Sequence, residues 1–243
     1  MKRIFLILLP SILLFSSCYD DGHFEPPPVN TNINNSKILV DASHDGGGWW
    51  APQWVGSGFN PALHHQGKGL ADLLRSMGYP VDELPSYTLI TDSILRQYDK
   101  VIRAGAYGAY QPGELAAYNN FLQRRSSLLL ISEYRQNPLD IDELAESLGV
   151  HFRGKYYDSV KHYVSHATTL NATPFYFNAG SVVSNESTNP QIQILGRLNN
   201  STGPGVMGIL NHPTSKIYFL GEINGLQTIP QPFTTQLFKW LFN

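Results

Sequence analysis

The chain has 243 residues and a mass of 27.1 kDa, with 42% hydrophobic and only 15% charged residues. The hydrophobic fraction is sufficient for a buried core, and it excludes a chain that is disordered throughout. The formal net charge is −2 and no stretch is rich in Lys or Arg, so a nucleic-acid partner is not expected. The single cysteine, Cys18, excludes intramolecular disulfides and a cysteine-rich metal site.

The N-terminus has the pattern of a secretory signal peptide over residues 1–17. Lys2 and Arg3 precede an apolar stretch at 4–15, which is shorter than the roughly 20 residues that cross a bilayer. The segment Phe15–Cys18 resembles the looser lipobox of Bacteroidetes lipoproteins. The resemblance implies cleavage before Cys18 and attachment of acyl chains such as palmitate to it. The alternative is an ordinary signal peptide with an incidental cysteine.

Residues 18–36 are expected to form a lipidated tether without a fold of its own. Three prolines at 26–28 favour stiff polyproline II, and an Asn-rich stretch follows. The acidic pair Asp20–Asp21 resembles the surface-export signal of Bacteroidetes lipoproteins. We therefore expect a protein anchored by lipid to the bacterial cell envelope, at the outer membrane, and exposed on the cell surface if the acidic pair acts as that signal.

Residues 37–243 are expected to form one α/β domain. Short apolar runs predict buried strands, and leucines or other apolar residues at three- and four-residue spacing predict helices. The alternation predicts a doubly wound, mostly parallel sheet with helices on both faces and a β-rich insertion after the fourth helix. The predicted strands are 37–41, 80–84, 100–104, 127–132 and 216–220, the predicted helices are 67–77, 89–97, 111–124, 140–148 and 234–242, and shorter strand-like pieces lie at 175–177, 191–198 and 206–210.

Several of these segments resemble the glutamine-amidotransferase-like superfamily, which includes ThuA-like and other bacterial families. The resemblance rests on the strand that ends at Asp41, "MGYPV" at 77–81, "DKVIRAG" at 99–105, "LLLISE" at 128–133 and "SKIYFLGE" at 215–222. It implies a flavodoxin-like fold with strand order 2-1-3-4-5 and a ligand crevice at the carboxyl ends of the strands.

The chain departs from that superfamily at its best-known chemistry. True amidotransferases carry a cysteine in the turn after the strand that corresponds here to 128–132. This chain has Glu133, Tyr134 and Arg135 at that turn, and no cysteine besides Cys18. Since no other side chain supplies such a thiolate, the protein is not expected to be a glutamine amidotransferase.

Polar residues at the predicted strand ends are the candidate ligand-binding groups. Their oxygens and nitrogens would meet in the implied crevice and act as hydrogen-bond partners or acid–base groups. In the alternative, Asp41 caps a turn and the histidines are surface residues. No metal-binding motif occurs, and neither a metal nor a cofactor is expected. The candidates are Asp41, His44, Asp45, Tyr107, Glu133 and Arg135 as ligand-binding residues, with Asp41, His44, Glu133 and Glu222 as catalytic candidates.

The predicted loop after the first strand contains three of the four tryptophans, Trp49, Trp50 and Trp54. Loops longer than about 12–15 residues are usually functional or disordered, and three large rings argue against disorder. Flat indole faces next to glycines suit stacking on sugar rings or docking of a partner. The alternative is that the rings cover the domain's own core.

The leading interpretation is therefore a non-catalytic lipoprotein domain that binds a carbohydrate or another small ligand at the strand ends. One alternative is a hydrolase, with glycans among its expected substrates, that uses a pair such as Glu133 and Glu222 as acid and base. Another is an assembly lipoprotein whose tryptophan loop docks a protein partner.

Overall fold

The computed structural model describes residues 37–44, 68–84, 88–105, 109–133, 141–184, 189–222 and 231–243. The predicted signal peptide, Cys18 and the tether lie outside these residues. Within them, nine strands form one sheet in the order β2-β1-β3-β4-β9-β8-β6-β5-β7. No helix in this described part is long and apolar enough to cross a membrane.

Five short strands form a parallel half of the sheet. Each is four or five residues long, and β1, β3, β4 and all but the first residue of β9 are buried, which explains their near-continuous apolar sequences. Their carboxyl ends therefore lie at one edge. These strands are β2 (Val81–Leu84), β1 (Ile38–Asp41), β3 (Lys100–Arg103), β4 (Ser127–Ile131) and β9 (Lys216–Leu220).

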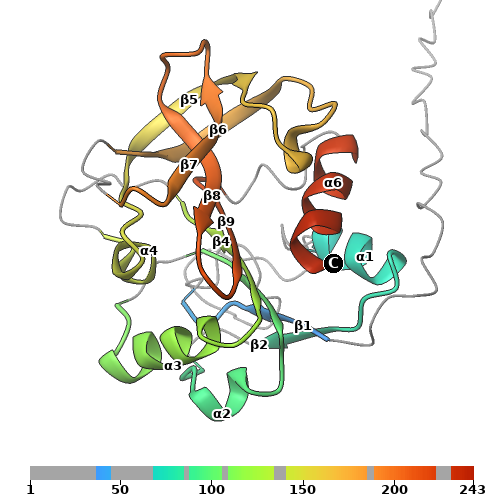
Figure 1. Cartoon of the computed structure of the whole chain (residues 1–243), viewed down its shortest axis with the longest axis vertical. Coiled ribbons are helices and arrows are strands. Elements are labelled where there is room, and N and C mark those ends of the chain that lie inside the picture. Colours follow the sequence, from blue (N-terminus) through green and yellow to red (C-terminus); the bar gives the residue numbers. More distant parts are fainter. Residues whose placement is uncertain are drawn as a thin grey trace, which may run out of the picture.

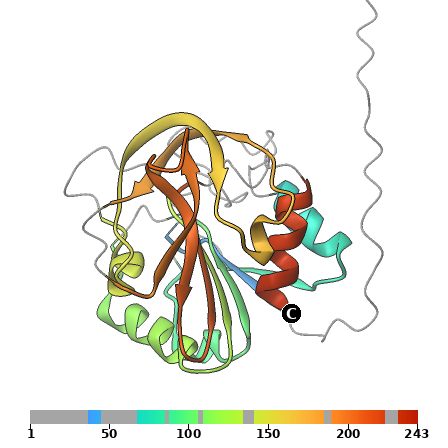
Figure 2. The same ribbon diagram turned by 45° about the horizontal axis from the view of Figure 1, so that its top comes forward.

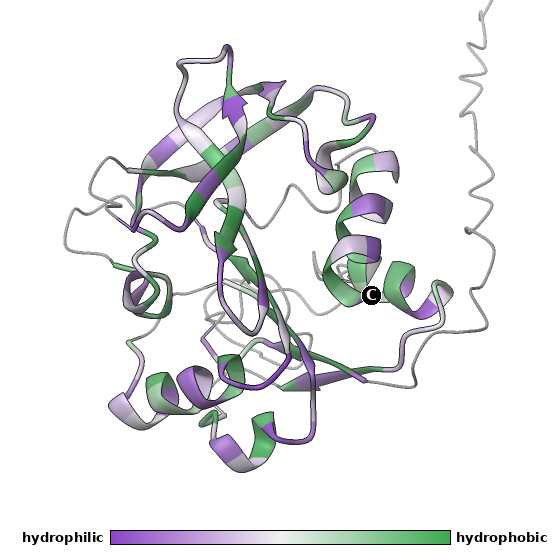
Figure 3. Ribbon diagram, in the orientation of Figure 1, coloured by the Kyte–Doolittle hydropathy of each residue, from purple (hydrophilic) through white to green (hydrophobic). Residues whose placement is uncertain are grey.

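Helices pack on both faces of the parallel strands and create two hydrophobic cores. One core joins α1 and α6 to residues such as Val40 and Leu129, and the other joins α2, α3 and α4 to residues such as Leu39 and Leu128. Figure 3 shows hydrophobic and hydrophilic stretches side by side on α1 and α6, as expected of helices with one buried face. The helices are α1 (Lys68–Ser76), α2 (Asp92–Leu95), α3 (Pro112–Leu122), α4 (Glu143–Ser147) and α6 (Gln231–Phe242), with a 3₁₀ turn η1 at Ala167–Thr169.

Four longer antiparallel strands gather at the opposite end of the molecule from α2 and α3 (Figure 1). Strand β5 pairs with β6 and β7, while β8 pairs with β7 and meets β6 at Val183 and Gly205. The four strands thus close on one another like a small barrel. Figure 2 shows the long hairpin of β8 and β9 that connects them to the parallel strands. The four are β5 (Phe152–Tyr163), β6 (Phe175–Val183), β7 (Ile192–Leu198) and β8 (Gly205–Asn211).

The predicted fold class, a flavodoxin-like and mostly parallel doubly wound sheet, is wrong. The described strands make four parallel and five antiparallel pairings, and the antiparallel strands are seven to twelve residues long. The helices have four to twelve residues. The fold is therefore β-rich and barrel-like. The error came from treating the region after α4 as short pieces, and from missing β5 altogether.

Candidate functional site

Four charged side chains are buried at the carboxyl ends of the parallel strands. Asp41 ends β1, Arg103 ends β3, Glu133 follows β4 and Glu222 follows β9, and none is more than 2% exposed. A buried charge is costly unless it is paired or loses its charge. Each of these charged groups therefore needs either a specific partner or a shifted pKa. Their contacts group them into two clusters.

The first cluster joins the end of β1 to α3. Asp41 accepts a hydrogen bond from the backbone N–H of Ser43 at 2.9 Å through Oδ1, and one from the hydroxyl of Tyr118 through Oδ2. Burial and the neighbouring Asp41 carboxylate raise the pKa of Tyr118 well above its ordinary value. Asp41 thus caps the turn after β1 and fixes α3 against the sheet, and both of its oxygens are engaged.

His44 lies against the same helix. Its Nε2 is 3.1 Å from Oε1 of Glu114, and its ring stacks on Tyr110 with centroids 3.8 Å apart. Glu114 also accepts from the backbone N–H groups of Gln111 at 2.8 Å and Ile90 at 3.1 Å. Although burial opposes its charge, these hydrogen bonds hold the pKa of Glu114 below its ordinary value. Asp41 and His44 are therefore brought together through α3, and His44 keeps a partly exposed side chain.

An ion pair that the sequence analysis did not identify lies beside this cluster. Arg103 donates to Asp142 through two hydrogen bonds, Nη1 to Oδ1 at 3.0 Å and Nη2 to Oδ2 at 2.6 Å. Burial opposes the charge on Arg103, but the Asp142 carboxylate outweighs it and the pKa of Arg103 is raised. Asp142 also accepts from the N–H of Ala145 at 3.1 Å and so caps α4. The only signal in the sequence was an arginine at the end of a strand predicted to be buried.

The second cluster is a pair of carboxyl groups, Glu133 and Glu222. Each lies two residues beyond the paired positions Ile131 and Leu220, so they end adjacent parallel strands. Burial and the charge of Glu133 raise the pKa of Glu222 to about 8, against a hydrogen bond from the N–H of Asn178 that lowers it. That bond reaches Oε1 at 3.0 Å, whereas the buried Oε2 has no hydrogen-bond partner within the described part of the chain.

This pair can donate and accept hydrogen bonds at neutral pH. A carboxyl group with a pKa of about 8 is mostly protonated at neutral pH. Glu222 can therefore donate one hydrogen bond through its O–H group and accept another at its second oxygen. A carboxyl group with a raised pKa beside a second carboxyl group is also an arrangement that can supply a general acid. Among the residues with a described position, no three His, Cys, Asp or Glu side chains form a group able to hold a metal ion.

The remaining candidates lie outside the described residues, and their positions stay predictions.

Of the candidates with a described position, Glu133 and Glu222 end adjacent strands, and Asp41 and His44 both contact α3. Tyr118, Glu114, Arg103 and Asp142 were not identified from sequence, because their roles depend on contacts between distant segments. The candidates without a described position are Cys18, Asp45, Trp49, Trp50, Trp54, Tyr107 and Arg135.

No family model matches the sequence, and no curated protein matches it. Solved structures do resemble the fold. The mmIFT52 N-terminal domain is 17% identical with a TM-score of 0.61, over 85% of this chain and 97% of that one. A ThuA-like protein from Bacteroides uniformis ATCC 8492 is 13% identical with a TM-score of 0.59, over 88% of this chain and 95% of that one. A β-galactosidase from Rahnella sp. R3 is 17% identical with a TM-score of 0.54, over 84% of this chain but 31% of that one.

At these identities the likeness shows the fold alone. The expected resemblance to ThuA-like proteins is confirmed at that level, because a ThuA-like structure matches nearly the whole of both chains.

Proposed function

We propose that the carboxyl pair Glu133 and Glu222 forms the centre of a binding site for a hydroxyl-rich ligand, a carbohydrate. The observation that carries the proposal is the buried Oε2 of Glu222, which has no partner among the described residues, on a group whose pKa is about 8. Sugar hydroxyls both donate and accept hydrogen bonds, so they suit a protonated carboxyl beside a second carboxyl. A ligand hydroxyl would supply the partner that a buried polar atom requires.

The tryptophans of the loop after β1 complete this proposed site. Residues 45–67 follow His44 in the sequence, and β1 ends at the same edge of the sheet as the strands that precede the carboxyl pair. In the proposal, Trp49, Trp50 and Trp54 stack on the faces of the sugar rings. Both Asp41 oxygens already accept hydrogen bonds from protein groups, so the proposal does not use Asp41 as a direct ligand-binding residue. Asp41 and His44 instead hold α3 against the sheet.

The proposal also places the domain on a membrane as a lipoprotein. Cleavage before Cys18 and its lipidation would anchor the chain at the outer membrane, with residues 18–36 as the tether. Glu133 stands where the amidotransferase-like proteins carry their cysteine, so we propose a domain that lacks that nucleophile. Binding then replaces glutamine hydrolysis as its activity.

A hydrolase acting on a glycan is the second candidate. It is favoured by the raised pKa of Glu222 beside Glu133, since glycoside cleavage uses one protonated and one ionised carboxyl group. The two candidates differ in turnover. A binding protein leaves its glycan unchanged, whereas a hydrolase consumes it and loses that activity in Glu222→Gln.

The test is a glycan-array screen of the full chain, in which each bound glycan is also assayed for product. Glu222→Leu, which removes both carboxyl oxygens, is compared with Glu83→Leu, the same change on the edge strand β2, where Glu83 pairs with Arg75. The proposal expects at least one bound glycan, with weaker binding to Glu222→Leu and unchanged binding to Glu83→Leu. Binding without product supports a binding module, and product formation supports the hydrolase. Binding of no glycan, or equal binding by both variants, would contradict both.

A further inference from the structure

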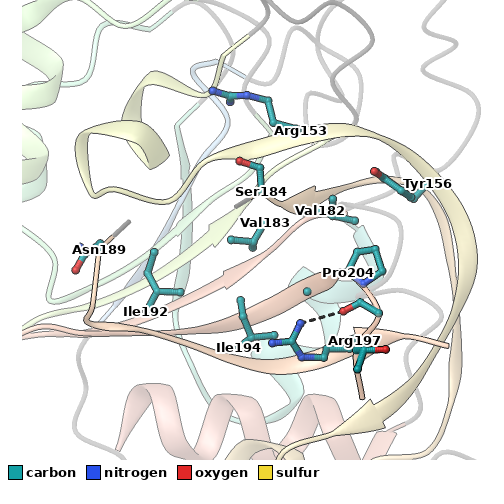
Figure 4. Close-up of a pocket in the computed structure, with 13 residues that line it drawn as sticks. Arg153, Tyr156, Val182, Val183, Ser184, Asn189, Ile192, Ile194, Arg197 and Pro204 are labelled. Carbon is teal, nitrogen blue, oxygen red and sulfur yellow. Dashed lines mark hydrogen bonds between the residues drawn. The ribbon is translucent and has the colours of Figure 1, made fainter. Parts of the chain in front are cut away.

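A pocket of about 650 Å³ opens between the antiparallel strands (Figure 4). Its volume falls within the range of roughly 300–1,000 Å³ that is usual for small-molecule sites. Val183 of β6 and Ile192 and Ile194 of β7 give it an apolar wall, and Pro204 extends this wall. Val183, Ile192 and Ile194 pack in part against one of the hydrophobic cores and are only partly buried, and Pro204 is exposed.

The pocket is also positively charged. Of the described residues that line it, two are arginines and none is acidic. Arg153 is balanced by Glu146, whose Oε1 lies 2.6 Å from its Nη1. Arg197 donates through Nη1 to the carbonyl of Gly203 at 2.9 Å, and no carboxylate of the described chain pairs with it. Its charge is therefore available to a ligand.

A bulge in β7 directs Arg197 into this pocket. Side chains alternate along a strand, so with Ile192 and Ile194 in the pocket, regular pairing would place residue 196 there and Arg197 on the other face. The register between β7 and β8 shifts on both sides of Gly196, and Arg197 lines the pocket instead. A Cβ at position 196 would lie 2.2 Å from Cε and 2.7 Å from Cγ of Met207, so a larger residue there requires this buried methionine side chain to move. Bulges of this kind re-aim side chains beside binding sites.

We propose that this pocket is a second ligand site, for a small amphipathic anion. The apolar body of the ligand would pack on Val183, Ile192 and Ile194, and its negative group would pair with Arg197. A negatively charged ligand distinguishes this site from the carboxyl pair at the strand ends, for which neutral hydroxyl groups are proposed. Small barrels commonly hold ligands between their strands, with apolar walls and a few polar groups that fix orientation.

The test compares two fluorescent probes on the full chain. Anilinonaphthalene sulfonate carries a negative group on an apolar body, and N-phenylnaphthylamine has nearly the same rings without the charge. The variants are Arg197→Gln and the control Lys161→Gln, which removes a positive charge from an exposed position on β5. We expect Arg197→Gln to bind the sulfonate about tenfold more weakly and the neutral probe within about twofold of the unmodified protein. Lys161→Gln should bind both probes as the unmodified protein does.

Equal sulfonate affinity in Arg197→Gln and the unmodified protein would overturn the proposal, as would equal weakening in Lys161→Gln or equal loss of both probes. A second measurement needs no variant, in case Arg197→Gln fails to fold. Amide NMR signals of Gly196, Gly203 and Gly205 should shift when the sulfonate is added to the unmodified protein. Shifts confined to other parts of the chain would also overturn the proposal.

Discussion

Arg103 and Asp142 form a bidentate ion pair whose two side chains are both fully buried, with the shorter contact at 2.6 Å. The pair connects the end of β3 to Asp142, the residue that caps the N-terminus of α4. Breaking such a pair leaves one buried charge without a partner, which costs far more than the loss of an exposed ion pair.

We therefore expect Arg103→Met to lower the free energy of unfolding by about 3–5 kcal/mol, measured by denaturant titration. The matched control is Arg96→Met, which breaks an exposed pair with Asp92 at 2.6 Å on α2 and should cost less than about 1 kcal/mol. Similar losses in the two variants would show that the buried pair has no special role.

Tyr118→Phe should lower the free energy of unfolding by about 1–3 kcal/mol, because it leaves a buried carboxylate oxygen of Asp41 without its donor. Tyr98→Phe removes a similar hydrogen bond to Asp82, at 3.0 Å, in a partly exposed position. Denaturant titration should show a loss below about 1 kcal/mol for this control. An equal or smaller loss in Tyr118→Phe would contradict the role given to Asp41.

Gly196→Ala should destabilise the protein by about 1–3 kcal/mol, since the new methyl group would meet Met207 in the bulge of β7. Gly113→Ala in α3 is the control, because nothing lies within 4 Å of a Cβ there. It should raise the free energy of unfolding by about 0.4–1 kcal/mol, because alanine lowers the conformational entropy of the unfolded chain. Thermal unfolding measures both changes. A shift of the melting temperature in the same direction for both variants would contradict the tight packing of Gly196 against Met207.

The raised pKa of Glu222 predicts a pH-dependent stability. The unfolded chain releases this proton near the ordinary pKa of 4.5, whereas the folded protein keeps it up to about 8. The stabilisation is therefore complete below 4.5 and is lost as the pH rises to about 8, by at most about 1.4 kcal/mol per pH unit. Denaturant titrations at about pH 5 and about pH 8 should show that the stability advantage of the unmodified protein over Glu222→Gln shrinks at the higher pH. An advantage that stays constant would contradict the assigned pKa.

The parallel strands were predictable because short apolar runs such as 127–132 lie between polar segments. Four of the five predicted helices contain a helix of the structure, and the fifth, 234–242, lies within α6. Strand β5 was not predictable in the same way. Its sequence, FRGKYYDSVKHY, carries charged residues along its length, and register shifts against both β6 and β7 disturb the two-residue alternation. Pairings between distant strands, which decide the barrel-like closure, leave no local pattern.

The candidate site was also predictable only in part, where a single strand carries the signal. A carboxylate at the end of an apolar strand was a signal for Asp41, Glu133 and Glu222. That Glu133 ends a strand adjacent to the one ended by Glu222 depends on the pairing of β4 with β9, more than eighty residues apart. Arg103 and Asp142 depend equally on packing, since α4 reaches the end of β3 only in the folded chain.

The most direct test of the central claim is the pH dependence of glycan binding. If protonated Glu222 donates a hydrogen bond to the ligand, the affinity of the unmodified protein for its best array glycan should be constant below a pH of about 8. It should fall about tenfold per pH unit above that. Glu222→Gln, whose amide donates at every pH, should bind without this dependence. A flat profile for the unmodified protein, or the same fall in Glu222→Gln, would contradict the claim that Glu222 binds the sugar.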